Sequence, residues 1–234
     1  MNIKDSVVLI TGANRGLGKA WALAVLAAGA RKVYAGARDP ASIDIPGVVP
    51  IRLDITAPDQ VAEAAKNCSD LTLLINNAGI ARGGDLMGPE AADMARAELE
   101  TNLFGTLAMS QAFAPVLAKN GGGAILNVLS VLSWITLPGA ATYSISKAAT
   151  WSMTNALRMS LRAQGTQVVG LHVGFMETEM TSGVDAPKEA PADVVRLALA
   201  AIEDGQEEVL ADDLTRAVKK GLSDIRGVYL DAPA

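Results

Sequence analysis

Short apolar runs alternate along most of the chain with longer stretches in which apolar side chains recur at helical spacing. The first run, residues 6–10, is apolar after its opening serine, as expected for a parallel strand that is covered on both faces. Six further runs lie at residues 32–37, 48–53, 71–75, 124–129, 167–173 and 208–210. Helical patterns lie at residues 19–28, from about 58 onwards, and at 89–119, 143–163, 191–203 and 214–222. This alternation predicts an α/β fold, a doubly wound parallel sheet with right-handed crossovers.

Two of the helical segments carry further information. The segment 89–119 contains Asn102, a weak helix former, and Gly105, so a local irregularity is expected there. The segment 143–163 is apolar all round, which predicts that one side packs on the sheet and the other on a partner subunit. No repeat, linker or low-complexity stretch divides the chain, so residues 1–234 are predicted to form a single domain.

Composition and charge argue against several classes of function. A net charge of -5 and a pI near 5.0 argue against nucleic-acid binding, which uses a basic patch. Cys68 is the only cysteine, so an intrachain disulfide is excluded and a reducing cytoplasm is expected. The chain start lacks signal-peptide features and no run of about 18 apolar residues occurs, so no membrane span is expected. His172, the only histidine, gives little support to a histidine metal site or a Ser-His-Asp hydrolase, and no metal is expected.

A glycine cluster directly follows the first predicted strand. It reads Thr-Gly-Ala-Asn-Arg-Gly-Leu-Gly over residues 11–18 and leads into the helical pattern at 19–28. Glycines let a backbone turn tightly and approach a pyrophosphate, and a helix start offers free N–H groups and a positive dipole end. A glycine cluster elsewhere is usually only a turn, but the strand–loop–helix context favours nucleotide binding here. The spacing is one residue longer than the common dinucleotide fingerprint.

Two arginines lie where the adenosine ribose of a dinucleotide would be bound. The second strand ends at Ala37, and Arg38 follows where an acidic residue would bind the ribose hydroxyl of NAD. Arg15 lies in the glycine cluster, and two guanidiniums can hold a 2′-phosphate through charge-assisted hydrogen bonds. The pair predicts NADP(H). In the alternative, Arg38 is solvated and Asp39 binds the ribose of NAD.

Polar residues also follow the third and fourth strands. Asp54 could contact the adenine amino group, or it could cap the helix that begins near Pro58, for which Thr56 is another candidate cap. Asn76 and Asn77 end the fourth strand, and each amide needs hydrogen-bond partners. The two asparagines are expected either to form a turn or to connect the strand ends around a cofactor.

The stretch from Ser130 to Lys147 carries the candidate chemistry. If Tyr143 opens a helix, Lys147 lies four residues further on and shares its face. An ammonium beside a phenol favours the phenolate, so the pKa of Tyr143 is expected to be lowered until the phenol exchanges a proton near neutral pH. The hydroxyls of Ser130 and Ser133 lie upstream, and either could reach the ring. Taken alone, Tyr143 and Lys147 would more often be an ordinary surface pair.

In this order, the motifs resemble the short-chain dehydrogenase/reductase family over about residues 6–180. The matching features are the glycine cluster at 11–18, Asp54, Asn76-Asn77-Ala78-Gly79, Asn102, Ser130, Tyr143 with Lys147, and Gly174 with Thr178. The resemblance implies a Rossmann-type, three-layer αβα fold whose seven strands follow the order 3-2-1-4-5-6-7.

The resemblance also implies catalytic roles for four residues. Tyr143 would be the general acid in ketone reduction, and Lys147 would bind the nicotinamide ribose and favour the phenolate. Ser130, at the family's spacing before the tyrosine, would hydrogen-bond the substrate oxygen, while Ser133 would line the pocket. Asn102 would hold a water in a proton relay that reaches Lys147. Hydride transfer is expected from the pro-S face of the nicotinamide.

The cofactor implied by the resemblance is NADP(H), with binding residues spread over the strand ends. The expected set is Gly12, Asn14, Arg15, Gly16, Leu17, Gly18, Arg38, Asp54, Ile55, Asn77, Ala78, Gly79, Gly174, Met176 and Thr178, together with Tyr143 and Lys147. The substrate pocket is expected to be apolar, with Ser133, Trp134, Phe175 and Met180 in its wall. Such a pocket favours a small hydrophobic ketone or alcohol.

Two departures from the family pattern affect these expectations. Val173-Gly174 replaces the Pro-Gly that many members carry after the sixth strand, and cofactor binding is expected to survive the change. The usual C-terminal strand ending in a glycine pair is absent, which puts a tetramer in doubt. A homodimer through the helices at 89–119 and 142–163 is expected instead.

The function predicted from these features is an NADPH-dependent carbonyl reductase, reversible as an alcohol dehydrogenase. One alternative is an NADP-binding regulatory or scaffold protein with little turnover, against which the complete set of candidate catalytic residues argues. Another is an epimerase, dehydratase or lyase on the same fold.

Overall fold

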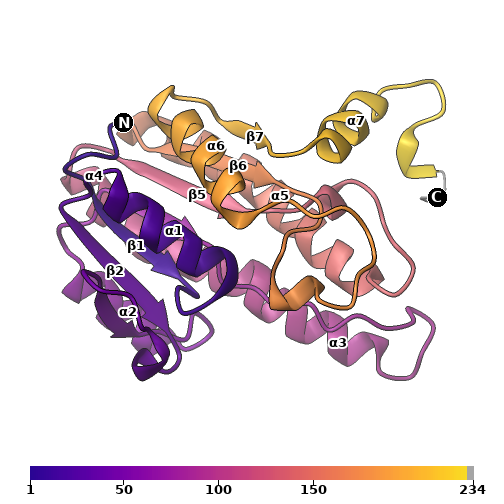
Figure 1. Ribbon diagram of the computed structural model, residues 1–234, viewed down its shortest axis with the longest axis horizontal. Helices are drawn as coiled ribbons and strands as arrows, with labels where there is room; N and C mark the ends of the chain where they lie inside the picture. Colours follow the sequence, from indigo (N-terminus) through magenta and orange to yellow (C-terminus); the bar gives the residue numbers. More distant parts are fainter. Residues whose placement is uncertain (231–234) are drawn as a thin grey trace.

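Seven parallel strands form one sheet at the centre of the molecule (Figure 1). The computed structural model describes residues 1–230, so residues 231–234 of the predicted single domain lie outside the described part. The strands are β1 (Val7–Thr11), β2 (Lys32–Ala37), β3 (Val49–Arg52), β4 (Leu73–Asn76), β5 (Ala124–Val128), β6 (Gln167–His172) and β7 (Glu208–Leu210). Their order is β3-β2-β1-β4-β5-β6-β7, and every neighbouring pair is parallel. The predicted sheet and its strand order are confirmed.

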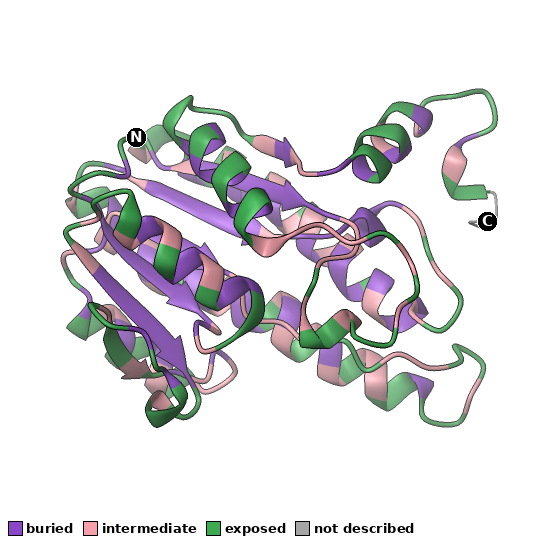
Figure 2. Cartoon of the chain, viewed as in Figure 1, coloured by how far each residue is buried: buried purple, intermediate pink, exposed green. Residues whose placement is uncertain are grey.

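Helices cover both faces of this sheet and complete the three predicted layers. Val8 and Ile10 of β1 point towards α1 and α6, whereas Val7 and Leu9 point towards α2, α4 and α5. The helices are α1 (Gly16–Ala27), α2 (Pro58–Asn67), α3 (Ala91–Glu98), α4 (Thr106–Lys119), α5 (Ala141–Leu161), α6 (Pro191–Glu203) and α7 (Asp213–Gly221). Residues 7–10 of β1 are fully buried, which is why the strand has apolar residues on both faces (Figure 2).

The long helix predicted over residues 89–119 is interrupted. It begins at Ala91 as α3, widens into a π-helical turn at Leu99–Gly105, and continues as α4. At Gly105 a Cβ would lie 2.7 Å from Cγ1 of Ile55, so only glycine lets the turn approach the end of β3 this closely. The irregularity expected around Asn102 is therefore present, and π-helical turns of this kind often occur at functional sites.

The C-terminal region packs against the segment that follows β5. That segment forms a short 3-10 turn, Val131–Ser133, before the chain enters α5. Val218 of α7 belongs to one apolar cluster with Val131 and Trp134, and Val228 packs against the same cluster. Within residues 1–230, no helix combines the length and hydropathy that crossing a bilayer requires.

Candidate active site

The ends of β1 and β4 are joined by side-chain hydrogen bonds at the carboxyl edge of the sheet. The Thr11 hydroxyl accepts the backbone N–H groups of Asn77 and Ala78 at 3.0 and 2.9 Å. The Asn77 amide in turn donates to the carbonyls of Thr11 and Gly12 at 2.9 and 3.3 Å. The strand order reverses between β1 and β4, and in open α/β sheets such a point is where ligands bind. Of the two alternatives, Asn77 thus connects the strand ends.

The glycine cluster forms a cradle in front of α1. Gly12 and Gly16 have positive φ angles of 67° and 51°, and a Cβ on Gly18 would lie 2.0 Å from the Gly12 carbonyl oxygen. Arg15 is the N-cap residue of α1, and no side chain caps the helix. The N–H groups of its first turn are therefore available to an anion. A phosphate fits this arrangement in both backbone shape and charge.

The segment after β6 reaches the same cradle. A Cβ on Gly16 would lie 3.6 Å from Cγ2 of Thr178, so the two predicted cofactor residues are neighbours. The backbone N–H of Gly174 donates to Oδ2 of Asp212 at 2.7 Å, and Oδ1 of the same carboxylate caps α7 by accepting the Thr215 N–H at 2.7 Å. Sequence analysis did not identify Asp212. Its only signal was the N-cap pattern of an aspartate before a helical stretch.

The two predicted phosphate-binding arginines are both exposed. Arg15 forms an ion pair with Glu179, and the side chains are 68% and 72% exposed. Arg38 lies near enough to Asp54 to help lower the pKa of that carboxyl. Asp39, the alternative ribose ligand, instead accepts the Ala41 N–H at 3.1 Å and caps a short 3-10 turn.

Asp54 forms a local turn and does not cap α2. Its Oδ1 accepts the backbone N–H and the hydroxyl of Thr56 at 3.0 and 2.7 Å, and these bonds are the main cause of its lowered pKa. Thr56 was a candidate N-cap, and that prediction was wrong because its hydroxyl is already bound to Asp54. The N-cap residue of α2 is Ala57, without a side-chain bond. Ile55, next to Asp54, is buried against the π-helical turn.

Lys147 is buried beside Tyr143 in the first turns of α5. Its ammonium donates to the Val128 carbonyl at 2.8 Å and lies 5.6 Å from the centroid of the tyrosine ring. Lys147 is only 5% exposed, and this burial lowers its pKa to about 8. A Cβ on Gly79 would lie 3.8 Å from the same nitrogen, so the loop after β4 closes over it.

The expected lowering of the Tyr143 pKa is wrong for the protein in this structure. Burial raises the pKa of the phenol, and the nearby Glu98 carboxylate raises it further. A hydrogen bond with Ser130 opposes both effects, but it is the smallest of the three. The prediction considered the lysine charge and neglected desolvation, which penalises the charged phenolate and is the largest cause of the raised pKa.

Glu98 is a second buried group that the sequence did not reveal. It is fully buried at the end of α3, where Oε1 accepts the Arg82 N–H at 2.7 Å and Oε2 has no hydrogen-bond partner. A glutamate in a helical pattern is usually exposed, so nothing in the sequence signalled this burial. Its charge acts directly on the pKa of Tyr143.

Asn102 joins the π-helical turn to the active-site loop and to α5. Its side chain accepts the Ile80 N–H at 2.8 Å, donates to the Ile80 carbonyl at 2.9 Å, and donates to the Ser146 hydroxyl at 2.9 Å. The backbone carbonyl of Asn102 accepts a hydrogen bond from the Thr150 hydroxyl at 3.1 Å. Buried polar groups of this kind need all their partners, so the network fixes Asn102 beside Lys147.

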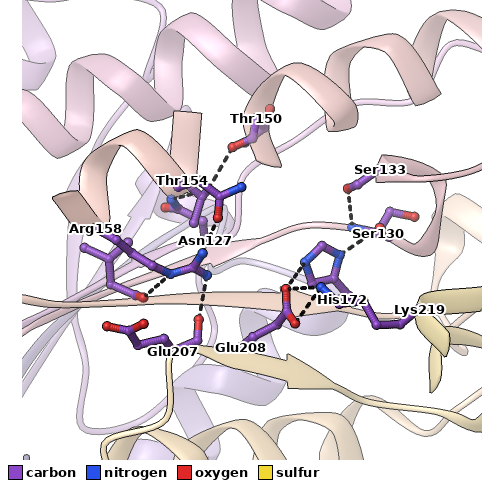
Figure 3. Close-up of polar contacts among 12 residues, drawn as sticks. Asn127, Ser130, Ser133, Thr150, Thr154, Arg158, His172, Glu207, Glu208 and Lys219 are labelled. Atoms are coloured by element: carbon purple, nitrogen blue, oxygen red, sulfur yellow. Dashed lines mark hydrogen bonds and ion pairs between the residues drawn. The ribbon is translucent and has the colours of Figure 1, made fainter. Parts of the chain in front are cut away.

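Of the two candidate serines, Ser130 is the one that acts on Tyr143, because its hydroxyl lowers the pKa of the phenol. Ser130 Oγ also accepts the Leu132 N–H at 3.1 Å, while Ser133 Oγ accepts the Ser130 N–H at 3.4 Å (Figure 3). Ser133 thus contacts the backbone of Ser130 and is itself buried.

One of the four predicted pocket residues, Trp134, lies in the apolar interior. Trp134 was expected in the pocket wall, but it lies in the apolar cluster behind the Val131–Ser133 turn, with its ring stacked on His172. The reason is that the 3-10 turn after Ser130 directs the indole towards β6 and α7. Phe175 is half-buried and Met180 is exposed, so these two stay candidates for the pocket wall.

Comparisons with known proteins agree on one family. A family model described as short chain dehydrogenase matches residues 6–189. The chain is 31% identical to a 3-oxoacyl-[acyl-carrier-protein] reductase of Synechocystis sp., over 77% of this chain and 78% of that protein. It is 34% identical to a reductase of the same name from Thermotoga maritima, again over 77% and 78%.

A solved structure extends the similarity over nearly the whole chain. A short chain dehydrogenase from Burkholderia cenocepacia J2315, in complex with NADP, is 44% identical and has a TM-score of 0.93. The match covers 97% of this chain and 96% of that one.

Proposed function

The chain belongs to the short-chain dehydrogenase family of oxidoreductases, and we propose that it is an NADPH-dependent carbonyl reductase that also catalyses the reverse alcohol oxidation. The observation that carries this proposal is one juxtaposition. Tyr143, whose pKa the Ser130 hydroxyl lowers and which lies next to buried Lys147, stands at the sheet edge that also holds an uncapped glycine cradle. This is the set of groups that a carbonyl reduction needs, a proton donor beside a dinucleotide site.

The residues present fit a dinucleotide. The glycine cradle and Thr178 would hold the pyrophosphate, Asp54 and Ile55 would face the adenine, and Lys147 would bind the nicotinamide ribose. When bound, the reduced nicotinamide supplies the hydride. Cofactor-binding roles for the remaining predicted residues, Asn14, Leu17, Asn77, Ala78, Gly79, Gly174 and Met176, are part of the same proposal.

NADP(H) is proposed over NAD(H) on two grounds. Arg15 and Arg38 flank the place of the adenosine ribose with positive charge, whereas the acidic alternative, Asp39, is engaged in a local cap. The NADP complex of the 44% identical Burkholderia protein supports the same preference.

Proton transfer is proposed to start at Tyr143. The Ser130 hydroxyl would hydrogen-bond the substrate carbonyl oxygen, and Tyr143 Oη would give that oxygen its proton as the carbon accepts hydride. The raised pKa of Tyr143 suits this direction, because the phenol keeps its proton until the developing alkoxide takes it. Lys147 and Asn102, which meet around Gly79, would then return a proton to the phenolate through a water.

The proposed substrate is a hydrophobic ketone or aldehyde. Phe175 and Met180 supply apolar surface beside the cofactor segment. The names of the Synechocystis and Thermotoga relatives denote reduction of a 3-oxo group, which supports a ketone as the reacting function.

A homodimer is proposed through the π-helical turn, α4 and α5. Phe104, Ile145 and Met159 lie on these elements and are 52%, 45% and 79% exposed. Covering such side chains in a second copy would remove apolar surface from water. Ile145→Asp should convert the dimer to monomer in sedimentation analysis, and an unchanged mass would place the interface elsewhere.

An assay of NADPH consumption with a panel of aryl and alkyl ketones tests the proposal. We expect hydrophobic ketones to be reduced, and NADH to serve poorly. The scaffold alternative predicts no consumption with any ketone. The epimerase and dehydratase alternatives predict product without change in nicotinamide absorbance.

A further inference from the structure

His172 is completely buried at the end of β6, directly behind Ser130. Its Nδ1 lies 3.2 Å from the backbone carbonyl oxygen of Ser130 (Figure 3). A carbonyl oxygen only accepts, so Nδ1 must carry the hydrogen and donate it. His172 is the only histidine of the chain, which makes its tautomer directly measurable.

The imidazole ring is held on its flat side as well. The Trp134 ring stacks on it with centroids 3.9 Å apart and planes 18° apart, and the edge of Trp134 contacts Trp151. Lys219 of α7 lies 4.8 Å from the centroid of Trp134. Its ammonium also pairs with Glu208 of β7 at 2.8 Å. The His172 ring is thus fixed between α7 and the segment that follows β5, which contains Ser130.

The second ring nitrogen is what makes histidine an unexpected choice here. Among residues 1–230, Nε2 has no hydrogen-bond partner, and it faces Oε1 of Glu208 at 3.7 Å, where both atoms are acceptors in the neutral tautomer. Burying an unpartnered polar atom is unfavourable, so an apolar side chain would serve packing alone better. The bond from Nδ1 to Ser130 is the interaction that an apolar residue could not provide.

We propose that His172 is a positioning residue for Ser130, whose carbonyl it holds so that the serine hydroxyl faces Tyr143. This inference rests on the proposed function, because the orientation of Ser130 affects turnover only if its hydroxyl binds the substrate oxygen. Ser130 is then held at three atoms: its carbonyl by His172 together with the Ser133 backbone N–H, its N–H by the Ser133 hydroxyl, and its hydroxyl by the Leu132 N–H. Removing one of these hydrogen bonds should displace the Ser130 hydroxyl. A displacement of ~1 Å at a catalytic group costs about 100-fold in rate.

Two substitutions of equal size separate positioning from packing. His172→Asn and His172→Leu remove the same part of the ring, but the asparagine amide nitrogen takes the place of Nδ1 and still donates. We expect the asparagine variant to keep kcat within about threefold of wild type and the leucine variant to lose about 10- to 100-fold, with unchanged NADPH affinity. His172→Gln, whose amide nitrogen takes the place of Nε2, should behave like leucine and replaces it if the leucine variant unfolds.

A Ser130→Ala background shows whether the effect passes through the serine. There the asparagine and leucine variants should have equal kcat, because no hydroxyl is left to position. If the ratio of kcat between the asparagine and leucine variants is the same with Ser130 as with Ala at position 130, the proposal is overturned and His172 is a purely structural residue.

Amide hydrogen exchange at residues 130–133 provides a readout that needs no turnover. We expect the Leu132 amide to exchange faster in the leucine variant than in the asparagine variant. If the wild type fails to reduce any ketone but this difference is present, the proposed function is refuted while His172 still positions Ser130. Equal exchange in the two variants would overturn the role of His172 whatever the activity.

Discussion

The two ends of the candidate site differ in how far their charges are exposed to water. At the cofactor end, Arg15 and Arg38 are solvent-exposed, and Arg15 pairs with an equally exposed Glu179. At the catalytic end, Lys147 and Asn102 are buried, and their side chains donate to a backbone carbonyl and a serine hydroxyl of the protein. A charge in water is screened, whereas a charge in the interior acts strongly on its neighbours.

This difference separates what each end can contribute. Exposed arginines can select between two cofactors by a moderate factor, and they can be exchanged without disturbing the fold. Buried groups set protonation states, and a change in one of them is felt through the whole network. Substitutions at the catalytic end should therefore have much larger effects than equal changes of charge at the cofactor end.

The largest effect should come from Tyr143→Phe. Removing the phenolic hydroxyl takes away the proton donor, so kcat should fall by about 10²- to 10⁴-fold. NADPH binding, measured by fluorescence titration, should change by less than about twofold. A variant with near-normal turnover would show that another group protonates the substrate, and a variant that loses NADPH binding would show that the tyrosine mainly serves the cofactor.

The next largest effect should be a loss of stability in acid caused by His172. Burial lowers its pKa from 6.5 to about 4, with Glu208 raising it and Lys219 and Arg158 lowering it. Between these pH values the unfolded chain binds the extra proton, so unfolding becomes easier as the pH falls, by up to about 3 kcal/mol. Urea unfolding of wild type and His172→Asn from pH 7 to pH 4.5 measures this. Parallel stability curves for the two proteins would contradict the prediction.

A smaller effect is expected at the cofactor end from Arg38→Asp. Loss of a charge-assisted bond and introduction of a carboxylate should shift the ratio of kcat/KM for NADPH over NADH by about 10- to 100-fold towards NADH. Arg31→Asp, at the opposite end of β2, makes the same change of charge away from the site and should shift nothing. Equal shifts in both variants would mean that net charge, and not Arg38, sets the preference.

The smallest effect should follow from Glu179→Gln. This substitution frees Arg15 from its ion pair, and exposed ion pairs contribute at most about 1 kcal/mol. The Kd for NADPH should tighten by about two- to fivefold at low salt and by less at high salt. A change of 100-fold would mean that the pair blocks the site far more strongly than its exposure suggests.

The same contrast between exposed and buried groups explains what the sequence could predict. The strands were visible because both faces are covered, so runs such as residues 73–75 lack polar residues. The order of the sheet followed from the family resemblance and is confirmed, whereas the strand–loop–helix context of the glycine cluster already indicated its place between β1 and α1. Asn102 and Gly105 also signalled an irregular helix, although its π-helical form depends on the approach of Ile55, which no local pattern encodes.

Burial of polar groups was the part that local patterns could not predict. The raised pKa of Tyr143 depends on Glu98, which lies 45 positions earlier in the sequence, and on desolvation by the folded chain. Trp134 and His172 stack because β6 and the turn after β5 are neighbours in the sheet. Asp212, which follows β7, accepts a hydrogen bond from the backbone N–H of Gly174, which follows β6. Each of these contacts depends on tertiary packing, so each had to be read from the structure.

Transfer of isotopic hydrogen from the cofactor to the product is the sharpest test of carbonyl reduction by this protein. The protein is incubated with a hydrophobic ketone and NADPH that carries deuterium in the pro-S position of the nicotinamide, and the alcohol is analysed by mass spectrometry and NMR. We expect one deuterium on the carbinol carbon of the product, with Tyr143→Phe forming that product at least about 100-fold more slowly. Conversion of the substrate without deuterium in the product, or without oxidation of NADPH, would contradict it.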